Sequence, residues 1–297
     1  MKIALFGNNH QASKSLHVQR IIDALRKHRF HIYIERDFAT FVSDVLGLSL
    51  TDCEVVSEAD LDADIAVSVG GDGTFLGTAS VVAGKDIPIL GINTGRLGFL
   101  ADVSPENIEQ AFDRLAAGDY LTEQHSLIAT TPHPQCTDVP PLALNEVAVL
   151  KHDNSSTIEI AVSINDQPMT NYVADGLLIA TPTGSTGYNL SAGGPIITPG
   201  TSALCLTPVA PHSLSVRPVV LPDNVKISLK VKSRSGRYLL ASDGRSLSLP
   251  DSVELCLGRA AQSIQVVKIF HTSYFNTLRA KLGWNDASIS ESRTSQL

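Results

Sequence analysis

Several short motifs that mark common nucleotide-binding and hydrolytic sites are missing from this sequence of 297 residues. It contains no GxxxxGKS/T, which excludes a P-loop, and no GxGxxG follows the first apolar run, which excludes a Rossmann dinucleotide fingerprint. HExxH and GxSxG are also missing, which excludes a zinc-peptidase helix and a nucleophile elbow. A phosphate or dinucleotide site in this chain must therefore be built by other means.

Cysteine, positive charge and long apolar runs are also scarce. The four cysteines lie far apart and form no CxxC pair, so we expect reduced, mostly buried thiols rather than a zinc site or a disulfide framework. Lys and Arg form no cluster and the net charge is -7, so we expect no nucleic-acid partner. No apolar run reaches the roughly 18 residues of a membrane span, and the start does not resemble a signal peptide. We therefore predict a cytoplasmic protein with no membrane partner.

The hydrophobic period changes at about Tyr120. Before it, short apolar runs such as residues 3–6 and 65–69 alternate with helical spacing, which predicts a parallel sheet with helices on both sides. After it, apolar and polar residues alternate at residues 158–164 and 225–231, which predicts antiparallel strands with one wet face.

We therefore predict an α+β fold of two domains. Residues 1–119 form an N-terminal α/β doubly wound, Rossmann-like domain, and residues 120–271 form a C-terminal all-β domain. Residues 272–284 return to helical spacing and are predicted to pack on the first domain, whereas residues 285–297 are polar and predicted to be disordered.

A carboxylate lies in a glycine turn at residues 70–74, whose sequence is Gly-Gly-Asp-Gly-Thr. The turn joins the predicted strand at residues 65–69 to a predicted helix at residues 74–82. Glycines allow close approach of a ligand to the backbone, and α/β sheets bind ligands at the carboxyl ends of their strands. The turn is therefore either a ligand site centred on Asp72 or a tight turn in which Asp72 caps the helix.

Two further stretches carry polar groups that suit a ligand. Residues 181–188 combine four hydroxyl side chains, two glycines and Tyr188, which suits ribose hydroxyls, phosphate oxygens or the face of a base, or else forms a Ser/Thr-rich structural loop. Asn145 and Glu146 interrupt an apolar strand, so one of them should point inward and need a partner. That partner is a ligand hydroxyl or a buried Lys or Arg.

Together these stretches resemble the NAD kinase family, and the resemblance extends from the first strand to Trp284. The family joins a Gly-Gly-Asp-Gly-Thr turn in an α/β domain to an Asn-Glu pair and a Thr-Pro-Thr-Gly-Ser-Thr-Ala-Tyr turn in an all-β domain. Residues 91–100, the Gly-Gly-Pro turn at residues 193–195 and the segment 278–284 also look like family features. Diacylglycerol and sphingosine kinases share only the first motif.

The resemblance implies transfer of the γ-phosphoryl group of ATP to the 2′-hydroxyl of the adenosine ribose of NAD. It implies a divalent cation, Mg²⁺ or Mn²⁺, held through the ATP phosphates with no metal-ligating residue assigned, and a homodimer or homotetramer. Asp72 matches the family's catalytic aspartate, as a general base, a metal contact or both. The implied substrate-binding residues are Gly70, Gly71, Gly73, Thr74, Asn145, Glu146, Asp175, Thr183, Thr186, Gly187, Tyr188, Ala210 and His212.

Three residues depart from the family pattern. Gly187 stands where Ala is usual, which should keep the backbone contacts and loosen the turn. His125 stands where Arg is expected, so a charge contact there is absent or pH-dependent. Val173 stands where some members carry Arg, at a position that bears on the choice between NAD and NADH.

Two alternative functions remain open at this point. A non-catalytic NAD(P) sensor on the same fold would keep the dinucleotide-holding residues, although the intact Asp72 and Asn-Glu pair disfavour it. A kinase for a lipid or sugar hydroxyl is supported by the first motif alone. Turnover of NAD to NADP separates both from an NAD kinase.

Overall fold

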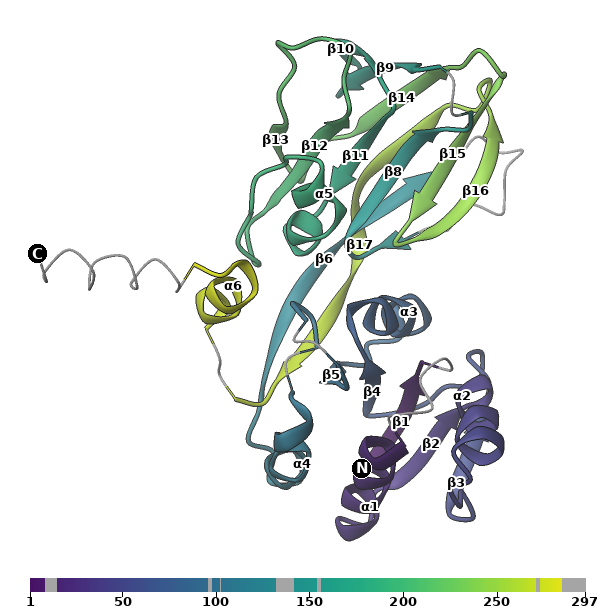
Figure 1. The fold of residues 1–297 in the computed structure, drawn as a ribbon, viewed down its shortest axis with the longest axis vertical. Coiled ribbons are helices and arrows are strands. Elements are labelled where there is room, and N and C mark those ends of the chain that lie inside the picture. The colour runs from purple at the N-terminus through teal and green to yellow at the C-terminus, as the bar shows by residue number, and fades with distance from the viewer. Residues whose placement is uncertain are drawn as a thin grey trace, which may run out of the picture. The chain divides into compact units, whose positions relative to one another are not determined.

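The chain divides into two compact units in the computed structural model. One unit is Met1–Glu123 together with Gln265–Leu297, and the other is Gln124–Ile264. Strands β6 (Leu121–Thr131) and β17 (Leu255–Lys268) contribute residues to both units, and Figure 1 shows the elements of each. The structure describes residues 1–8, 15–95, 98–101, 103–131, 142–153, 156–270 and 273–284. Within these ranges, no helix is both long and apolar enough to span a membrane.

The first unit is built on a parallel sheet, as the sequence predicts. Its strand order is β5-β4-β1-β2-β3, and β17 adds to β5 in parallel through Val266 opposite Ile89. Every residue of β4 is buried, as expected for a strand with both faces covered. The strands are β1 (Lys2–Gly7), β2 (His31–Glu35), β3 (Cys53–Val56), β4 (Ile65–Gly70) and β5 (Ile89–Asn93).

Helical segments connect these strands. The helical segment between β2 and β3 has two parts, because α2 (Arg36–Thr40) changes to a π-helical turn at Phe41–Val45. Pro105 opens a short 3-10 turn, Pro105–Asn107, rather than entering the α-helix directly. The α-helices of this part of the chain are α1 (Ser15–Lys27), α2 (Arg36–Thr40), α3 (Asp72–Val82) and α4 (Ile108–Ala116).

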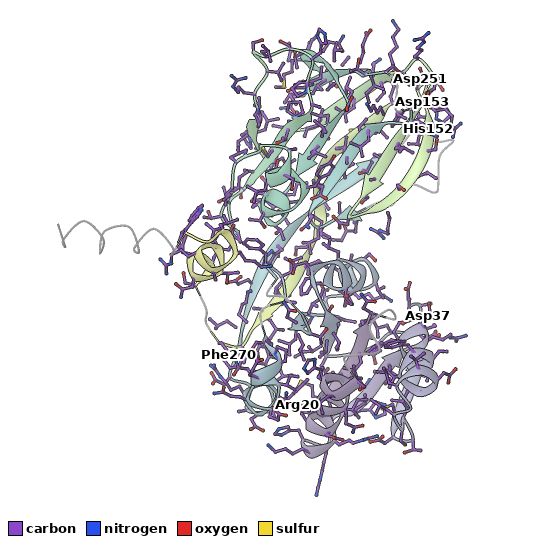
Figure 2. All side chains as sticks on the ribbon, viewed as in Figure 1. Arg20, Asp37, His152, Asp153, Asp251 and Phe270 are labelled. Carbon is purple, nitrogen blue, oxygen red and sulfur yellow. The ribbon has the colours of Figure 1, made fainter. Side chains whose placement is uncertain are left out.

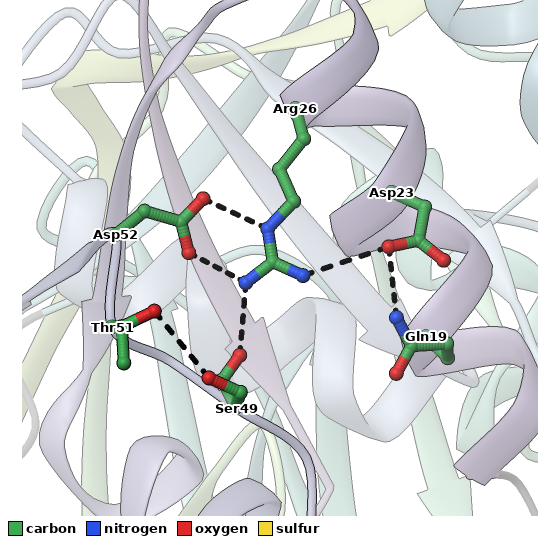
Figure 3. Close-up of polar contacts among 6 residues, drawn as sticks. All are labelled: Gln19, Asp23, Arg26, Ser49, Thr51 and Asp52. Atoms are coloured by element: carbon green, nitrogen blue, oxygen red, sulfur yellow. Dashed lines mark hydrogen bonds and ion pairs between the residues drawn. The ribbon is translucent and has the colours of Figure 1, made fainter.

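Charged side chains of helix α1 form ion pairs with helix α4 and with the loop that precedes β3. Arg20, labelled in Figure 2, forms a bidentate ion pair with Glu109 of α4, with Nε to Oε1 at 2.7 Å. Figure 3 shows Arg26 bonded to Asp52 (Nε to Oδ2, 2.8 Å) and to the carbonyl of Ser49 (2.9 Å). The hydrogen bond from Arg26 lowers the pKa of Asp52. These contacts hold the loop that leads into β3, a strand missing from the sequence-based prediction because two of its four residues are exposed apolar or acidic groups.

The second unit consists of two antiparallel sheets. One has the order β10-β9-β14-β17 and the other β13-β12-β11-β8-β15-β16. The inward-facing side chains of both sheets form one cluster, in which Tyr238 is fully buried. The strands are β7 (Leu142–Ala143), β8 (Glu146–Lys151), β9 (Ile158–Ile164), β10 (Gln167–Ala174), β11 (Gly176–Ala180), β12 (Ala203–Val209), β13 (Val219–Pro222), β14 (Ile227–Lys232), β15 (Arg237–Ser242) and β16 (Arg245–Pro250).

The predicted C-terminal helix is present as α6 (Tyr274–Leu282), which ends at Gly283 in the left-handed conformation (φ 68°). It belongs to the first unit, and the Lys281 ammonium lies 5.6 Å from the centroid of the Phe99 ring. The predicted disordered tail, residues 285–297, lies outside the described residues.

Only one of the described cysteines is buried. Cys205 is fully buried, whereas Cys53 and Cys256 are half-buried, and none of the three is in a disulfide. Cys136 lies outside the described residues. The prediction of mostly buried thiols is therefore wrong for two of the three, because Cys53 and Cys256 lie on strands with one partly open face.

Candidate active site

Asp72 is the first residue of α3, and its side chain bonds to a different segment of the chain. Its Oδ2 accepts a hydrogen bond from the N–H of Phe99 (2.9 Å), and its Oδ1 accepts from Leu100 (3.0 Å) and Ala101 (3.4 Å). The helix is capped by Gly71 with no side-chain hydrogen bond. The capping alternative for Asp72 is therefore wrong, and its carboxylate instead holds residues 98–101 against the start of the helix.

The glycines around Asp72 differ in the space that a Cβ atom would have at each position. A Cβ at Gly98 would lie 2.0 Å from Asp72 Oδ1, and a Cβ at Gly70 would lie 2.2 Å from Thr74 Oγ1. A Cβ at Gly71 or Gly73 would meet nothing within 4 Å. The first two glycines therefore make room for neighbouring side chains, whereas the other two leave the backbone open. Because the first N–H groups of a helix lack intrahelical partners, this open turn can accept an anion.

A hollow of about 470 Å³ lies beside this turn, within the first unit. Gly73 and Thr74 line it together with three carboxylate side chains, those of Glu35, Asp37 and Glu58. The Glu35 carboxylate is already bonded to the N–H groups of Asp37 and Phe38 at the start of α2. The hollow is therefore lined both by the start of helix α3, whose N–H groups can bind an anion, and by three carboxylate side chains.

In the second unit, Asn145 and Glu146 lie at the start of β8. A half-buried carboxylate that the sequence analysis did not single out, Asp243, accepts hydrogen bonds from the N–H groups of Leu144 (2.7 Å), Asn145 (2.8 Å) and Glu146 (3.2 Å). The N–H of Asp243 donates to the Glu146 carbonyl at 3.1 Å. An Asp-Gly turn between two strands is a hairpin signal, and it is the one feature of the sequence that indicates Asp243.

The side chains of this pair hold unused buried acceptors. Asn145 Oδ1 and Glu146 Oε2 are buried and have no hydrogen-bond partner among the described residues. Burial first, and then the nearby Asp243 carboxylate, raises the pKa of Glu146 to about 7. No Lys or Arg of the described residues forms an ion pair with Glu146. Buried polar atoms without partners cost about 1–3 kcal/mol each, which favours a bound ligand here.

The turn after β11 packs directly on this pair. Thr181 Oγ1 donates to the Leu144 carbonyl (2.6 Å) and accepts from the N–H of Gly184 (3.1 Å). Ser185 Oγ donates to the Pro182 carbonyl (2.6 Å) and accepts from the N–H of Ile197 (3.0 Å). Two of the four hydroxyls of the turn are therefore structural, so the structural-loop alternative is correct for these two, and the ligand alternative stays a prediction.

The other two hydroxyls lie in the 3-10 turn η4 (Thr183–Thr186). Thr183 Oγ1 lies 2.8 Å from His125 Nδ1, and Thr186 Oγ1 contacts the Thr183 carbonyl at 3.4 Å. A Cβ at Gly187 would lie 3.2 Å from Glu146 Oε2. The Tyr188 ring, at the start of α5 (Tyr188–Ser191), is 40% exposed and free to stack. Gly184 and Gly187 of this turn lie directly against Asn145 and Glu146.

The remaining predicted residues lie at the opposite end of β11. Asp175, which precedes this strand, forms an ion pair with Lys151 (2.8 Å). Ala210 has a left-handed backbone (φ 44°), and the N–H of His212 donates to the Val173 carbonyl (2.8 Å). Since Ala180 pairs with Glu146 and each residue advances a strand by about 3.3 Å, the two groups are separated by roughly 16 Å along β11. Such a separation suits an elongated ligand, each end of which would contact one of the two groups of residues.

Asn189 of α5 organises the polar interior behind this turn. Its Nδ2 donates to the carbonyls of Ser185 (3.1 Å) and Pro195 (3.1 Å), and its Oδ1 accepts from Thr207 Oγ1 (2.6 Å). A Cβ at Gly194 would lie 2.2 Å from the Asn189 side chain, which explains the second double glycine.

We expect Asn189→Ala to lower the free energy of unfolding by about 3 kcal/mol, because it removes three hydrogen bonds made by a fully buried side chain. Urea denaturation measures this change. Asn171, exposed on β10, offers a matched control, and Asn171→Ala should shift the free energy by less than about 0.5 kcal/mol. Equal effects at the two positions would contradict the assigned role of Asn189.

Comparison with known proteins agrees with this geometry. The model of the ATP-NAD kinase N-terminal domain matches residues 3–120, and that of the ATP-NAD kinase C-terminal domain matches residues 144–268. An NAD kinase of Bacteroides fragilis (strain YCH46) is 48% identical over 284 residues, covering 96% of this chain and 98% of that protein. The chain belongs to the NAD kinase family.

Further NAD kinases extend the comparison. The NAD kinase of Porphyromonas gingivalis (strain ATCC 33277) is 41% identical, covering 96% of this chain and 99% of the relative. An Archaeoglobus fulgidus NAD kinase solved in complex with ATP superposes with a TM-score of 0.73 at 27% identity, covering 95% and 98% of the two chains. A yeast NADH kinase solved with NADH gives a TM-score of 0.84 at 24% identity, covering 96% and 88%, and supports the fold.

The resemblance found in the sequence is thereby confirmed, as is the predicted organisation of an α/β domain, an all-β domain and a C-terminal helix. As a member of the NAD kinase family, the protein is a phosphotransferase that phosphorylates NAD with ATP.

Proposed function

We propose that Asn145 and Glu146 hold the ribose that is phosphorylated and that Asp72 serves the transfer of the γ-phosphoryl group to its 2′-hydroxyl. The observation that carries this proposal is the pair of buried acceptors, Asn145 Oδ1 and Glu146 Oε2, which lack partners beside a turn rich in hydroxyls. Ribose hydroxyls both donate and accept, so they satisfy such a pair.

The rest of NAD is assigned to residues around that pair. Thr183, Thr186, Gly187 and Tyr188 would contact the nearer base and ribose, with Tyr188 providing a stacking face. Asp175, Ala210 and His212, roughly 16 Å away along β11, would contact the far end of the dinucleotide. Support comes from the spacing of the two groups, which matches a ligand with two nucleoside ends.

The donor phosphates are assigned to the glycine turn of the first unit. The backbone at Gly71 and Gly73 is open, and Gly70 and Thr74 complete the turn at the start of α3. A carboxylate has roughly four lone-pair positions, and three of those of Asp72 are occupied by backbone N–H groups. The remaining position would accept or orient the hydroxyl proton of the acceptor ribose.

We further propose that a divalent cation, Mg²⁺ or Mn²⁺, accompanies ATP. The hollow beside Gly73 carries carboxylates from Glu35, Asp37 and Glu58, which would repel a bare polyphosphate, so a cation is needed to neutralise the charge. Hard cations prefer oxygen ligands, and Mg²⁺ keeps several waters while bound through phosphates and one or two carboxylates. The residues present fit this arrangement. When bound, the ion would neutralise charge on the transferring phosphoryl group.

Direct assay tests the proposal. The purified chain is incubated with NAD or NADH as acceptor and with ATP or polyphosphate as donor, and NADP or NADPH is measured with a coupled dehydrogenase. We expect NADP from NAD and ATP. A protein that binds NAD but forms no product with any donor would be a sensor. Phosphorylation of a lipid or a sugar in place of NAD would indicate the third candidate function.

Two further features are proposed from the family alone. We expect a homodimer or homotetramer, which sedimentation velocity measures, and we expect the protein in the cytoplasm, which cell fractionation measures.

A further inference from the structure

Four hydrogen bonds join the turn between β15 and β16 to the start of β8. The carboxylate of Asp243 accepts three of them from Leu144, Asn145 and Glu146, and the N–H of Asp243 donates the fourth to the Glu146 carbonyl. Asp243 has a left-handed backbone (φ 47°), a conformation that Asp tolerates better than most residues. The turn is therefore shaped to point this carboxylate at the backbone of the Asn-Glu pair.

The carboxylates of Asp243 and Glu146 also influence each other electrostatically. Burial and the Asp243 charge raise the pKa of Glu146 to about 7. Burial also raises the pKa of Asp243, whereas its three backbone N–H donors and Arg245 act to lower it. Hydrogen bonds to a carboxylate favour its charged form, and Asp243 accepts three of them, whereas Glu146 Oε2 accepts none from the described residues.

Among the described residues, the other elements that pack on Glu146 contribute no charged group that shifts its pKa. On β11 its cross-strand partner is Ala180, and on the adjoining turn its neighbour is Gly187. Asp243 and Arg245, both of the β15–β16 hairpin, are the charged groups of the described chain that act on this pair.

We infer that Asp243 is a positioning residue for Asn145 and Glu146, and that its charge adds to the effect of burial, so that NAD binding releases a proton from Glu146. The inference depends on the proposed role of Glu146 as a ribose ligand. In the free protein the Glu146 carboxyl is protonated in about half of the molecules at pH 7. When a ribose hydroxyl donates its O–H to this group, the carboxylate form is favoured, the O–H bond of the carboxylic acid breaks, and its proton passes to the buffer.

Calorimetry of NAD binding without ATP tests the inference. Titrations in buffers with different ionisation enthalpies, over pH 6 to 8.5, give the number of protons released per NAD bound. At pH 7 we expect roughly half a proton per site, because Glu146 in the free protein is about half protonated there. Release should disappear well above pH 8, where Glu146 of the free protein is already ionised.

Three variants test whether Glu146 is the source of the proton and whether the Asp243 charge affects its release. Glu146→Gln should abolish the pH-dependent release. Asp243→Asn keeps an oxygen acceptor but removes the charge, so the pKa of Glu146 should fall and the release window should move to lower pH, with roughly half or less of the wild-type release at pH 7. The matched control is Asp251→Asn, at a turn labelled in Figure 2 where the carboxylate accepts only from Ser233 (3.2 Å), and it should release protons as the wild type does.

The outcomes are distinct. Release that is unchanged in folded Asp243→Asn overturns the inference. If Asp243→Asn does not fold, the wild type and Glu146→Gln still decide, because NAD binding without release, or equal release from both, also overturns it. Failure to bind NAD at all would refute both the inference and the proposed function, whereas binding with release but without NADP formation would refute only the catalytic part of that function.

Discussion

Replacing Asp72 with Asn should lower kcat for NADP formation by about 10²–10⁴-fold while the Kd for NAD changes little. The factor is that expected for losing a positioned acid–base group. NAD binding should survive because the proposed ribose ligands, Asn145 and Glu146, belong to the other unit. Initial rates with saturating ATP give kcat, and calorimetry gives the Kd.

A charge-matched control is available on the surface of the same unit. Asp52→Asn removes one negative charge and disrupts the ion pair with Arg26 drawn in Figure 3, yet it should leave kcat within about twofold. If Asp72→Asn retained most of the wild-type kcat, the proposed catalytic role of Asp72 would be refuted.

Hydrogen exchange distinguishes chemistry from loop anchoring. In Asp72→Asn one carboxylate oxygen becomes an NH₂ group, so at least one of the N–H groups of Phe99, Leu100 and Ala101 loses its acceptor. Faster exchange of these amides together with loss of kcat would show that the loop moved. Unchanged exchange with loss of kcat would assign the effect to the carboxylate itself.

The second large effect is expected from Gly184→Ala. A Cβ at this position would lie 2.1 Å from the carbonyl oxygen of Asn145 and 2.6 Å from its Cα, and a backbone cannot move aside as a flexible side chain can. We expect the free energy of unfolding to fall by about 3 kcal/mol. The displaced Asn145 should also weaken NAD binding by more than tenfold. Urea denaturation and calorimetry measure the two changes.

Two other glycines serve as controls. Gly77→Ala, in helix α3 where a Cβ meets nothing within 4 Å, should stabilise the protein by up to about 1 kcal/mol. Gly187→Ala, in the same turn as Gly184, places its methyl group 3.2 Å from the side-chain oxygen Glu146 Oε2 and should fold as the wild type does. If all three variants had similar stability, close packing of the turn on Asn145 would be wrong.

Hydrophobic periodicity was sufficient to predict most of the fold. The fully apolar run of β4 and the alternating residues of β9 are decided by local burial, so their patterns are visible in sequence. Strand β3 was missed because its exposed residues break the pattern. The predicted boundary between residues 119 and 120 stays a prediction, although the contact-based division of the chain falls within β6.

The site was less accessible to sequence reasoning, because its key partners are distant in the chain. Asp243 contacts residues about 100 positions earlier through its carboxylate and backbone, a pairing that no local spacing reveals. From sequence the hydroxyls of residues 181–186 cannot be told apart. In the structure, those of Thr181 and Ser185 donate hydrogen bonds to backbone carbonyls and stabilise the turn. Which group each hydroxyl bonds depends on its three-dimensional neighbours, so residue type alone could not separate them.

The discontinuity of the first unit has a consequence for how the chain folds during synthesis. Val267 and Ile269, which are fully buried, belong to the same hydrophobic cluster as Ile3, Leu5 and Ile92. The ribosome makes these two residues only after the whole second unit. The hydrophobic core of the first unit therefore stays incomplete until the second unit has been synthesised. The second unit is continuous in sequence and can close before it, which reverses the usual order in which the N-terminal part of a protein folds first.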